Sequence, residues 1–262
     1  MKKIFACILV VLGLFTICAC NKVPTKTTSF DSGSVKMIAH RGLSGMEVEN
    51  TESAFIEAGK RSYYGIESDV RKTRDGKFVM CHDATLTRIA GKNIDVETST
   101  LEDLLKVPLL PKHEDDVKVE YLTTLERYII ICKEYDKQAI LELKSIFTEA
   151  EIKNIIDIID SLGYISRTTF ISFDYDNLLY VRKFLPEQSA MYLFSVFSTK
   201  TIEQLVRDNI DVALSHQALT PNAVNAFHKA GLKVNCWTVD GISRAENLVE
   251  MGVDYITTNV LE

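Results

Sequence analysis

The sequence predicts a (β/α)8 barrel, and three observations support this fold class. Eight short apolar runs alternate with helix-like segments from residue 36 onward. The runs lack a clear polar–apolar alternation, which is typical of parallel strands buried on both faces. Polar and charged residues gather where the runs end, and active sites of such barrels lie at that edge. A doubly wound parallel sheet is the alternative, because strand order cannot be read from a sequence.

Short apolar runs give the strands, and apolar side chains spaced three and four residues apart give the helices. Asn50-Thr51 suits the start of one helix, and Gly163 suits the end of another. The expected strands cover residues 35–40, 66–70, 138–144, 168–173, 190–194, 212–216, 233–238 and 254–257. Further helices are expected over residues 125–132, 152–159, 176–184, 201–208, 221–230 and 242–251.

The connection after the second strand is too long for a single crossover helix. It runs from residue 71 to residue 137 and contains an added strand at 77–82, a short helix near 101–105 and a charged stretch at 108–120. A connection at the carboxyl end of a barrel strand lies over the mouth of the barrel. We therefore expect an inserted cap, about residues 71–121, that helps to shape the pocket.

The N-terminal residues have the pattern of a bacterial export signal. Lys2 and Lys3 precede an apolar run that is short for a membrane span. The run ends in Ile17-Cys-Ala-Cys20, which resembles a lipobox with Cys20 as the lipidated residue. We expect a signal peptide at 1–19, a polar tether at 20–35 and a lipid-anchored exported protein. A short transmembrane anchor and a plain secretory peptide are the alternatives.

Composition limits what the remaining chain can be. With 262 residues, 46% hydrophobic and 25% charged, the chain is large enough for one core, and we expect one domain over residues 36–262. Loss of residues 1–19 would take the formal charge from −6 to −8, which gives no electrostatic reason to expect a nucleic-acid partner. Cys81, Cys132 and Cys236 are an odd number within apolar segments, so we expect buried thiols and no disulfide.

Two carboxylates lie in one expected strand, within Gly65-Ile-Glu-Ser-Asp-Val70. Glu67 and Asp69 are two residues apart, so their side chains point to the same face. Like charges on a buried face repel each other and are costly to desolvate. A hard divalent cation with oxygen ligands would stabilise them. Solvated acids on an edge strand are the alternative explanation for an isolated pair.

Further polar residues stand at the ends of other expected strands. His40-Arg41 ends the first strand and His82-Asp83 ends the added strand. Glu142 and Lys144 share a face of the third strand, and Trp237 ends the seventh. In a barrel these ends converge, so the sequence predicts an active site there. Structural roles are expected for His113 and His228, and His216 is left unassigned.

Seven short motifs carry a family resemblance. They are Ala39-His-Arg-Gly42, Glu49-Asn-Thr51 with Ala54-Phe55, Gly65–Val70, Thr73-Arg-Asp-Gly76, His82-Asp83 with Leu86 and Arg88, Leu141-Glu-Leu-Lys144 and Cys236-Trp-Thr-Val239. In this order and spacing, the chain resembles the glycerophosphodiester phosphodiesterase family from about residue 36 to the C-terminus. Val48 replaces a usual proline, and Leu122-Thr-Thr-Leu-Glu126 replaces an Ile-Pro-Thr-Leu-Glu run. Both departures lie outside the expected reacting groups, so they affect the expected substrate preference more than the expected catalytic activity.

The resemblance implies a (β/α)8 barrel with a segment inserted after the second strand. It implies metal-dependent hydrolysis of glycerophosphodiesters to sn-glycerol 3-phosphate and an alcohol. The implied roles are metal ligation of one Ca²⁺ or Mg²⁺ by Glu67, Asp69 and Glu142, acid–base catalysis by His40 and His82, and phosphate binding by Arg41 and Lys144. Trp237 would contact the substrate or plug the barrel. Asn50 would cap a helix and support the site, and Asp83 and Arg88 would support His82.

Two other functions are compatible with the same motifs. A related barrel phosphodiesterase could act on lysophospholipid or sphingolipid head groups, and an apolar rim at the mouth would favour that substrate class. A surface lipoprotein could keep the fold as a binding module without catalysis. Such a module is expected to lose a histidine or a carboxylate, and none of the expected ones is missing.

Overall fold

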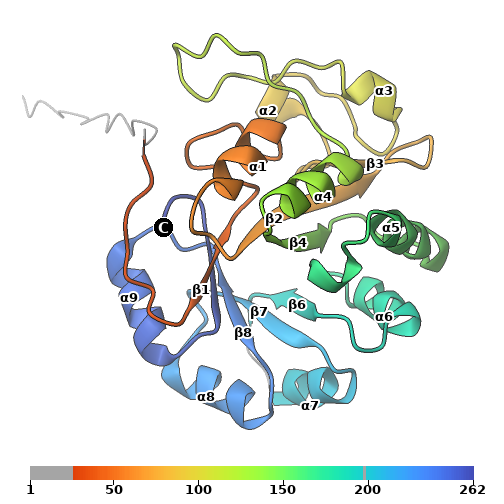
Figure 1. The fold of residues 1–262 in the computed structure, drawn as a ribbon. Helices are drawn as coiled ribbons and strands as arrows, with labels where there is room; N and C mark the ends of the chain where they lie inside the picture. The colour runs from red at the N-terminus through yellow and green to blue at the C-terminus, as the bar shows by residue number, and fades with distance from the viewer. Residues whose placement is uncertain (1–25, 197–198) are drawn as a thin grey trace, which may run out of the picture.

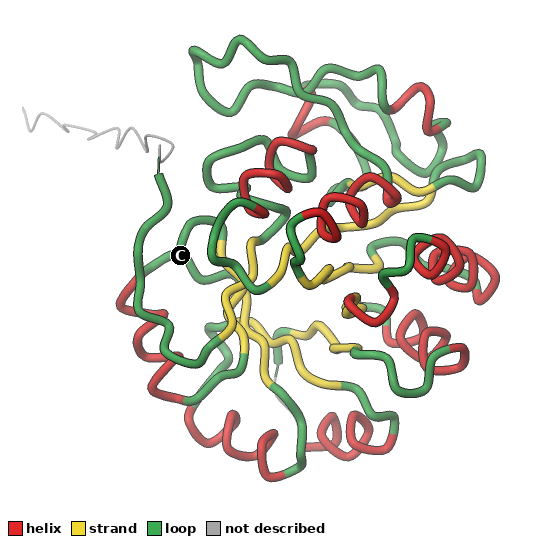
Figure 2. Tube along the Cα trace, in the orientation of Figure 1, coloured by secondary structure: helices red, strands yellow, loops and turns green. Residues whose placement is uncertain are grey.

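A closed barrel of eight parallel strands is the centre of the molecule, with helices around it (Figures 1 and 2). The computed structural model describes residues 26–196 and 199–262. Strand β1 pairs in parallel with both β2 and β9, and this pairing closes the sheet. The expected (β/α)8 barrel is confirmed, and an open doubly wound sheet is excluded. The expected signal peptide, residues 1–19, lies outside the described residues.

All eight expected barrel strands are present. The strands of the sheet are β1 Lys36–Ala39, β2 Gly65–Lys72, β3 Phe78–Met80, β4 Gln138–Leu143, β5 Thr168–Ser172, β6 Ala190–Phe194, β7 Asp211–Ser215, β8 Val234–Trp237 and β9 Tyr255–Thr258. The helices are α1 Glu52–Gly59, α2 Thr87–Ala90, α3 Leu101–Leu104, α4 Leu125–Glu134, α5 Glu149–Ser161, α6 Tyr175–Phe184, α7 Thr199–Arg207, α8 Pro221–Lys229 and α9 Ile242–Met251, with a 3₁₀ turn at Ile165–Arg167. Among the described helices, none is long and apolar enough to cross a bilayer.

Alternation along the strands separates two apolar layers. One face of each strand packs against the surrounding helices in the main core. The other face points into the barrel, where a smaller cluster fills the interior: Ile38, Ile140, Ile171, Met191, Leu193, Ala213 and Tyr255. Polar residues follow these apolar ones toward the carboxyl ends of the strands. The interior is therefore packed below and polar at the mouth.

The inserted segment has a core of its own. The added strand that the sequence predicts is present as β3, and it pairs antiparallel with β2. Beneath α2 and α3 lies a separate apolar cluster that includes Val79, Leu86, Val96 and Leu104. Helix α2 was not expected from the sequence, since it is a single turn that ends at Gly91. The insertion lies to one side of the barrel (Figure 1), where β3 brings His82 to the mouth.

Part of the expected tether lies along the barrel. The backbone N–H of Thr28 donates to the carbonyl of Val260 at 2.9 Å, and that of Phe30 donates to Glu262 at 2.7 Å. Thr27 Oγ1 also donates to the Glu262 carboxylate. The described residues of the tether are therefore held against the C-terminal segment, ahead of β1.

Candidate active site

Three buried carboxylates meet at the mouth of the barrel. Glu67 and Asp69 lie on β2, and Glu142 lies on β4 directly opposite Asp69 in the strand register. One carboxylate oxygen from each residue lies within 4.8 Å of those of the other two. Burial and the neighbouring acids raise the pKa of Glu142 to about 7 and raise that of Glu67 well above its usual value. Burial acts on Asp69 in the same way, but Arg41, His82 and Lys144 hold its pKa below the usual value.

The donor set of this cluster fits a hard divalent cation. Asp69 Oδ2 accepts a hydrogen bond from Asn50 Nδ2 at 3.0 Å, and Ser68 Oγ donates to Asn50 Oδ1 at 2.7 Å. Asp69 Oδ1 is buried and accepts no hydrogen bond from any described residue. A cluster that keeps a buried carboxylate oxygen free and repels itself when ionised is stabilised by a bound cation. The expected placement of these three residues at one point is confirmed.

Asn50 orients a carboxylate and does not cap the helix. The sequence indicated both roles for it, but Thr51 is the N-cap of α1, accepting from the Ala54 N–H. Asn50 instead has φ of 57°, which directs its amide toward Asp69. Asparagine tolerates this left-handed backbone better than most residues because its short amide can bond locally.

His40 directly follows β1 and is fixed by Asn259. The His40 Nδ1 atom lies 2.7 Å from Asn259 Oδ1, and Asn259 Nδ2 donates to Asp240 at 2.6 Å. Because the Asp240 carboxylate only accepts, the Asn259 oxygen faces His40, whose Nδ1 therefore donates. His40 Nε2 then faces the Glu67 carboxylate at 4.0 Å. Burial, followed by the charge of Arg41, lowers the pKa of His40 to about 4.

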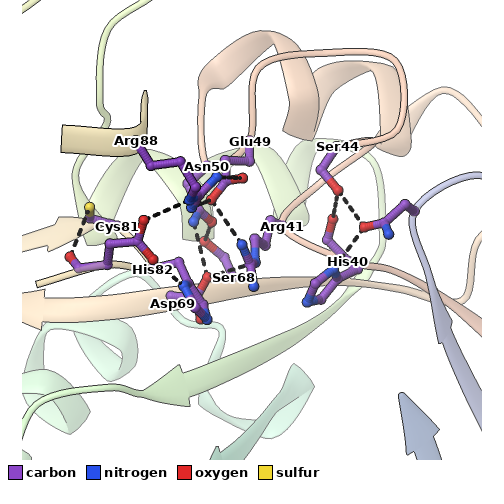
Figure 3. A network of polar contacts seen from close by, with 12 residues as sticks. His40, Arg41, Ser44, Glu49, Asn50, Ser68, Asp69, Cys81, His82 and Arg88 are labelled. Carbon is purple, nitrogen blue, oxygen red and sulfur yellow. Dashed lines mark hydrogen bonds and ion pairs between the residues drawn. The ribbon is translucent and has the colours of Figure 1, made fainter. Parts of the chain in front are cut away.

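His82 is fixed by a carboxylate, and Arg88 fixes that carboxylate (Figure 3). His82 Nδ1 lies 2.7 Å from Asp83 Oδ1, and Arg88 Nε donates to Asp83 Oδ2 at 2.7 Å. The other two nitrogens of Arg88 donate to both oxygens of Glu49, each at 2.7 Å. Glu49 in turn accepts from Arg41 Nη1 at 3.0 Å. The Arg88 guanidinium therefore links Asp83, which supports His82, to Glu49, which supports Arg41. The sequence predicts the supporting role of Asp83 and Arg88.

Two cations border the acidic cluster. Arg41 Nε lies 3.6 Å from Asp69 Oδ2, is buried and donates no hydrogen bond to a described residue. Lys144 Nζ lies 2.8 Å from Glu142 and 3.9 Å from Asp69. Arg41 has φ of 53° and is followed by Gly42 with φ of 74°. At Gly42 a Cβ atom would lie 2.7 Å from the backbone of Ala54, so only glycine fits this turn.

A pocket connects these groups to the interior of the barrel. Its lining includes every predicted site residue except Asp69, which lies opposite the lining residue Glu142 in the strand register. Trp237 forms part of the wall, with its Nε1 donating to the Ala213 carbonyl at 3.0 Å and its ring 5.5 Å from that of Phe173. From the charged stretch 108–120, Lys112 donates to the Ser44 carbonyl and lines an adjoining pocket beside His40 and Arg41.

The structure agrees with the sequence for His113, His228 and the cysteines, and it places His216, which was left unassigned, beside Arg244. His113 contacts the Met46 carbonyl, His228 contacts Asp254, and His216 contacts Arg244, all away from the acidic cluster. The three cysteines Cys81, Cys132 and Cys236 are buried and free. Sequence reasoning missed Asn259 and the supporting role of Glu49. Asn259 directly follows β9, so the rule that strand ends build the site would have found it.

A parallel barrel with buried acids, paired imidazoles and two cations at its mouth defines an enzyme that acts on an anionic substrate. The chain belongs to the glycerophosphoryl diester phosphodiesterase family, whose model matches residues 40–262. It is therefore a phosphoric diester hydrolase.

Individual relatives agree with this family. The chain is 29% identical over 227 residues to a glycerophosphodiester phosphodiesterase of Caldanaerobacter subterraneus, covering 85% of this chain and 93% of that protein. A crystal structure of a glycerophosphodiester phosphodiesterase from Parabacteroides distasonis has 27% identity and a TM-score of 0.72, covering 89% and 94% of the two chains. A phosphodiesterase of Oleispira antarctica, solved with the product sn-glycerol-3-phosphate, has 24% identity, a TM-score of 0.75 and coverage of 88% and 96%.

Proposed function

We propose that this enzyme hydrolyses glycerophosphodiesters, the deacylated phospholipids, to sn-glycerol 3-phosphate and an alcohol. The observation that carries the proposal is the meeting of Glu67, Asp69 and Glu142 within 4.8 Å, beside two imidazoles from separate strands. Family membership supports the substrate class. The product bound to the Oleispira antarctica enzyme supports the proposed product.

Glu67, Asp69 and Glu142 would hold one divalent ion, Ca²⁺ or Mg²⁺. When bound, such an ion neutralises negative charge on the phosphate oxygens. Arg41 and Lys144 would neutralise the rest, since the unpaired Nε of Arg41 and the ammonium of Lys144 border the cluster. Arginine offers a planar fork that suits phosphate, and lysine offers a point charge.

The partners of the two histidines favour different roles. A diester cleavage needs a base for the nucleophile and an acid for the leaving alcohol on opposite sides of phosphorus. His40 contacts a neutral amide, and its low pKa keeps Nε2 free to accept a proton. Burial lowers the pKa of His82 as well, but the Asp69 charge and the hydrogen bond to the Asp83 carboxylate oppose that shift and favour the protonated imidazole. We therefore assign the base to His40 and the acid to His82. Figure 3 places them apart, with Arg41 between them.

Trp237 would pack against the substrate at the pocket wall. Its indole N–H is already bonded to the barrel backbone, so the ring is held in place and offers an apolar face. Together with Phe173 it would exclude water from one side of the phosphodiester.

A second candidate substrate is a lysophospholipid or sphingolipid head group. The observation that favours it is the exposure of Ile146 (78%) and Val196 (79%), which follow β4 and β6 at the mouth. Phe173, after β5, is also exposed. Exposed apolar side chains on neighbouring loops suit an acyl chain. A third candidate is an inactive binding lipoprotein, which predicts ligand binding without turnover.

We also propose that the protein is exported and anchored through lipidated Cys20. Since residues 27–30 are bonded to the C-terminal segment, the chain from Cys20 to Thr27 could span at most about 25 Å, at roughly 3.5 Å per residue. Such a tether would hold the enzyme close to the membrane. Expression of the Cys20→Ser variant tests this directly: it should move the protein from the membrane fraction to the soluble exported fraction. An unchanged membrane fraction would contradict lipidation at Cys20.

A metal-dependent activity screen tests the function. The wild type would be assayed on glycerophosphocholine, glycerophosphoethanolamine and glycerophosphoglycerol, and on lysophosphatidylcholine, with Ca²⁺, Mg²⁺ or chelator. The proposal expects release of sn-glycerol 3-phosphate from the deacylated substrates and none with chelator. Preferential head-group release from lysophosphatidylcholine would support the second candidate. No turnover of any substrate with either ion would support the third.

A further inference from the structure

The pocket has a polar floor, and no role has been assigned above to the residues that form it. Asn235 on β8 and Thr257 on β9 both line it, although they are only 1% and 3% exposed. Thr257 Oγ1 donates to Asn235 Oδ1 at 3.2 Å, which orients the amide. Asn235 Nδ2 donates to no residue that the structure describes. An oriented amide donor that lines the pocket and has no protein acceptor is suited to bind an acceptor on a ligand.

The surroundings give this floor a definite shape. Asn235 and Trp237 are two residues apart on β8, so both face the interior. The residue opposite Asn235 on β7 is Ala213, whose small side chain leaves room beside the amide. The buried side chains of Ile171 and Leu193 complete the lining. The floor is thus enclosed and apolar apart from one oriented amide and one hydroxyl.

We infer that Asn235 binds the terminal hydroxyl of the substrate's glycerol, so that the floor is a glycerol subsite. The inference rests on the proposed function. In glycerophosphodiesters the glycerol arm is constant and the alcohol arm varies in size, so the enclosed floor suits the glycerol and the open mouth suits the alcohol. An acyl chain on the terminal oxygen would have to enter the closed barrel interior. The subsite therefore selects deacylated substrates over lysophospholipids.

Binding of two ligands to two proteins tests the inference. By calorimetry with excess Mg²⁺ or Ca²⁺, sn-glycerol 3-phosphate would be compared with 2-hydroxypropyl phosphate, in which the terminal CH₂OH is CH₃. The wild type should bind the hydroxylated ligand about 3- to 10-fold more tightly, the range for one neutral hydrogen bond. The Asn235→Ala variant should bind both ligands with equal affinity, and this affinity should match that of the wild type for 2-hydroxypropyl phosphate. The matching phosphocholine diesters should show the same pattern in kcat/KM.

Several outcomes would overturn the inference. A preference retained in Asn235→Ala, or an equal loss for both ligands, would show that Asn235 does not contact the hydroxyl. If Asn235→Ala does not fold, Thr257→Val replaces it, and should reduce the preference because it removes the group that orients the amide. Asn225→Ala, exposed on α8, is the matched control. If both diesters are hydrolysed at equal rates, the proposed function holds and the glycerol subsite is refuted. If the wild type binds the hydroxylated ligand selectively but turns over neither diester, the subsite holds and the proposed function is refuted.

Discussion

Asp69 on β2 and Glu142 on β4 lie directly opposite each other in the parallel register, with Lys144 within 4.0 Å of both. The strands place two buried acids side by side, and Glu67 on the same strand adds a third. When ionised, these carboxylates therefore repel one another at the mouth of the barrel. Positive charge bound at this site removes the repulsion.

Glu142→Gln should relieve this repulsion in the absence of metal. The pKa of Glu142 is about 7 in the folded protein and about 4.5 in the unfolded chain, because burial and Asp69 disfavour its charge. Its contribution to stability is therefore fully present below pH 4.5 and is lost as pH rises through 7. The predicted quantity is the free energy of unfolding of the variant minus that of the wild type, measured with chelator. This difference should be up to about 3 kcal/mol larger above pH 8 than near pH 4.5.

Chemical denaturation of both proteins across this pH range measures the difference, so that titrating groups remote from Glu142 cancel. A stability difference that does not change between pH 4.5 and 8 would show that Glu142 is not buried against like charge.

Leaving-group rescue should separate the two histidines. His40→Ala and His82→Ala should each reduce kcat on glycerophosphocholine by about 100-fold or more, as loss of an acid or base does. With a p-nitrophenyl ester of glycerol phosphate, the leaving group needs no proton, so His82→Ala should recover most of its activity and His40→Ala should not. Steady-state kinetics on both substrates checks this assignment. The opposite rescue would exchange the two roles, and near-normal activity of either variant on both substrates would remove that histidine from the mechanism.

Arg88→Lys should reduce catalysis without unfolding the protein. Lysine keeps the charge but cannot bond Asp83 and both oxygens of Glu49 together. We expect kcat/KM to fall about tenfold, with little change in melting temperature because Arg88 is half exposed. The acid limb of the pH–rate profile should also shift, because Asp83 supports His82.

Arg167→Lys is the matched control, since Arg167 contacts the exposed Asp136 at the amino ends of β4 and β5, the edge of the barrel opposite the site. Loss of activity in both variants, or loss of melting temperature in Arg88→Lys alone, would indicate a structural role for Arg88.

The sequence predicted most of the fold, because buried parallel strands are short apolar runs and the helices between them keep their periodicity. It also predicted the acidic cluster, since Glu67 and Asp69 share a face of one expected strand and Glu142 lies on the next expected strand of the barrel. Helix α2 was missed because its single turn begins after Leu86 with no capping side chain, whereas Thr100 marks the start of the equally short α3.

The supports of the site were harder to predict. Asn235 lies within an apolar run, and only the register with Ala213 and the contact with Thr257 shows that it faces the pocket. Asn259 depends on a contact across 219 residues of sequence with His40. Asn50 was expected as a cap, but its role depends on a positive φ that sequence patterns do not reveal.

Calorimetric titration of Ca²⁺ and Mg²⁺ tests the central claim most directly. The account predicts one ion per wild-type chain, loss of that binding in Asp69→Asn, and unchanged binding in Glu102→Gln, whose carboxylate is on the surface. Absence of saturable binding by the wild type, or equal binding by Asp69→Asn, would contradict it.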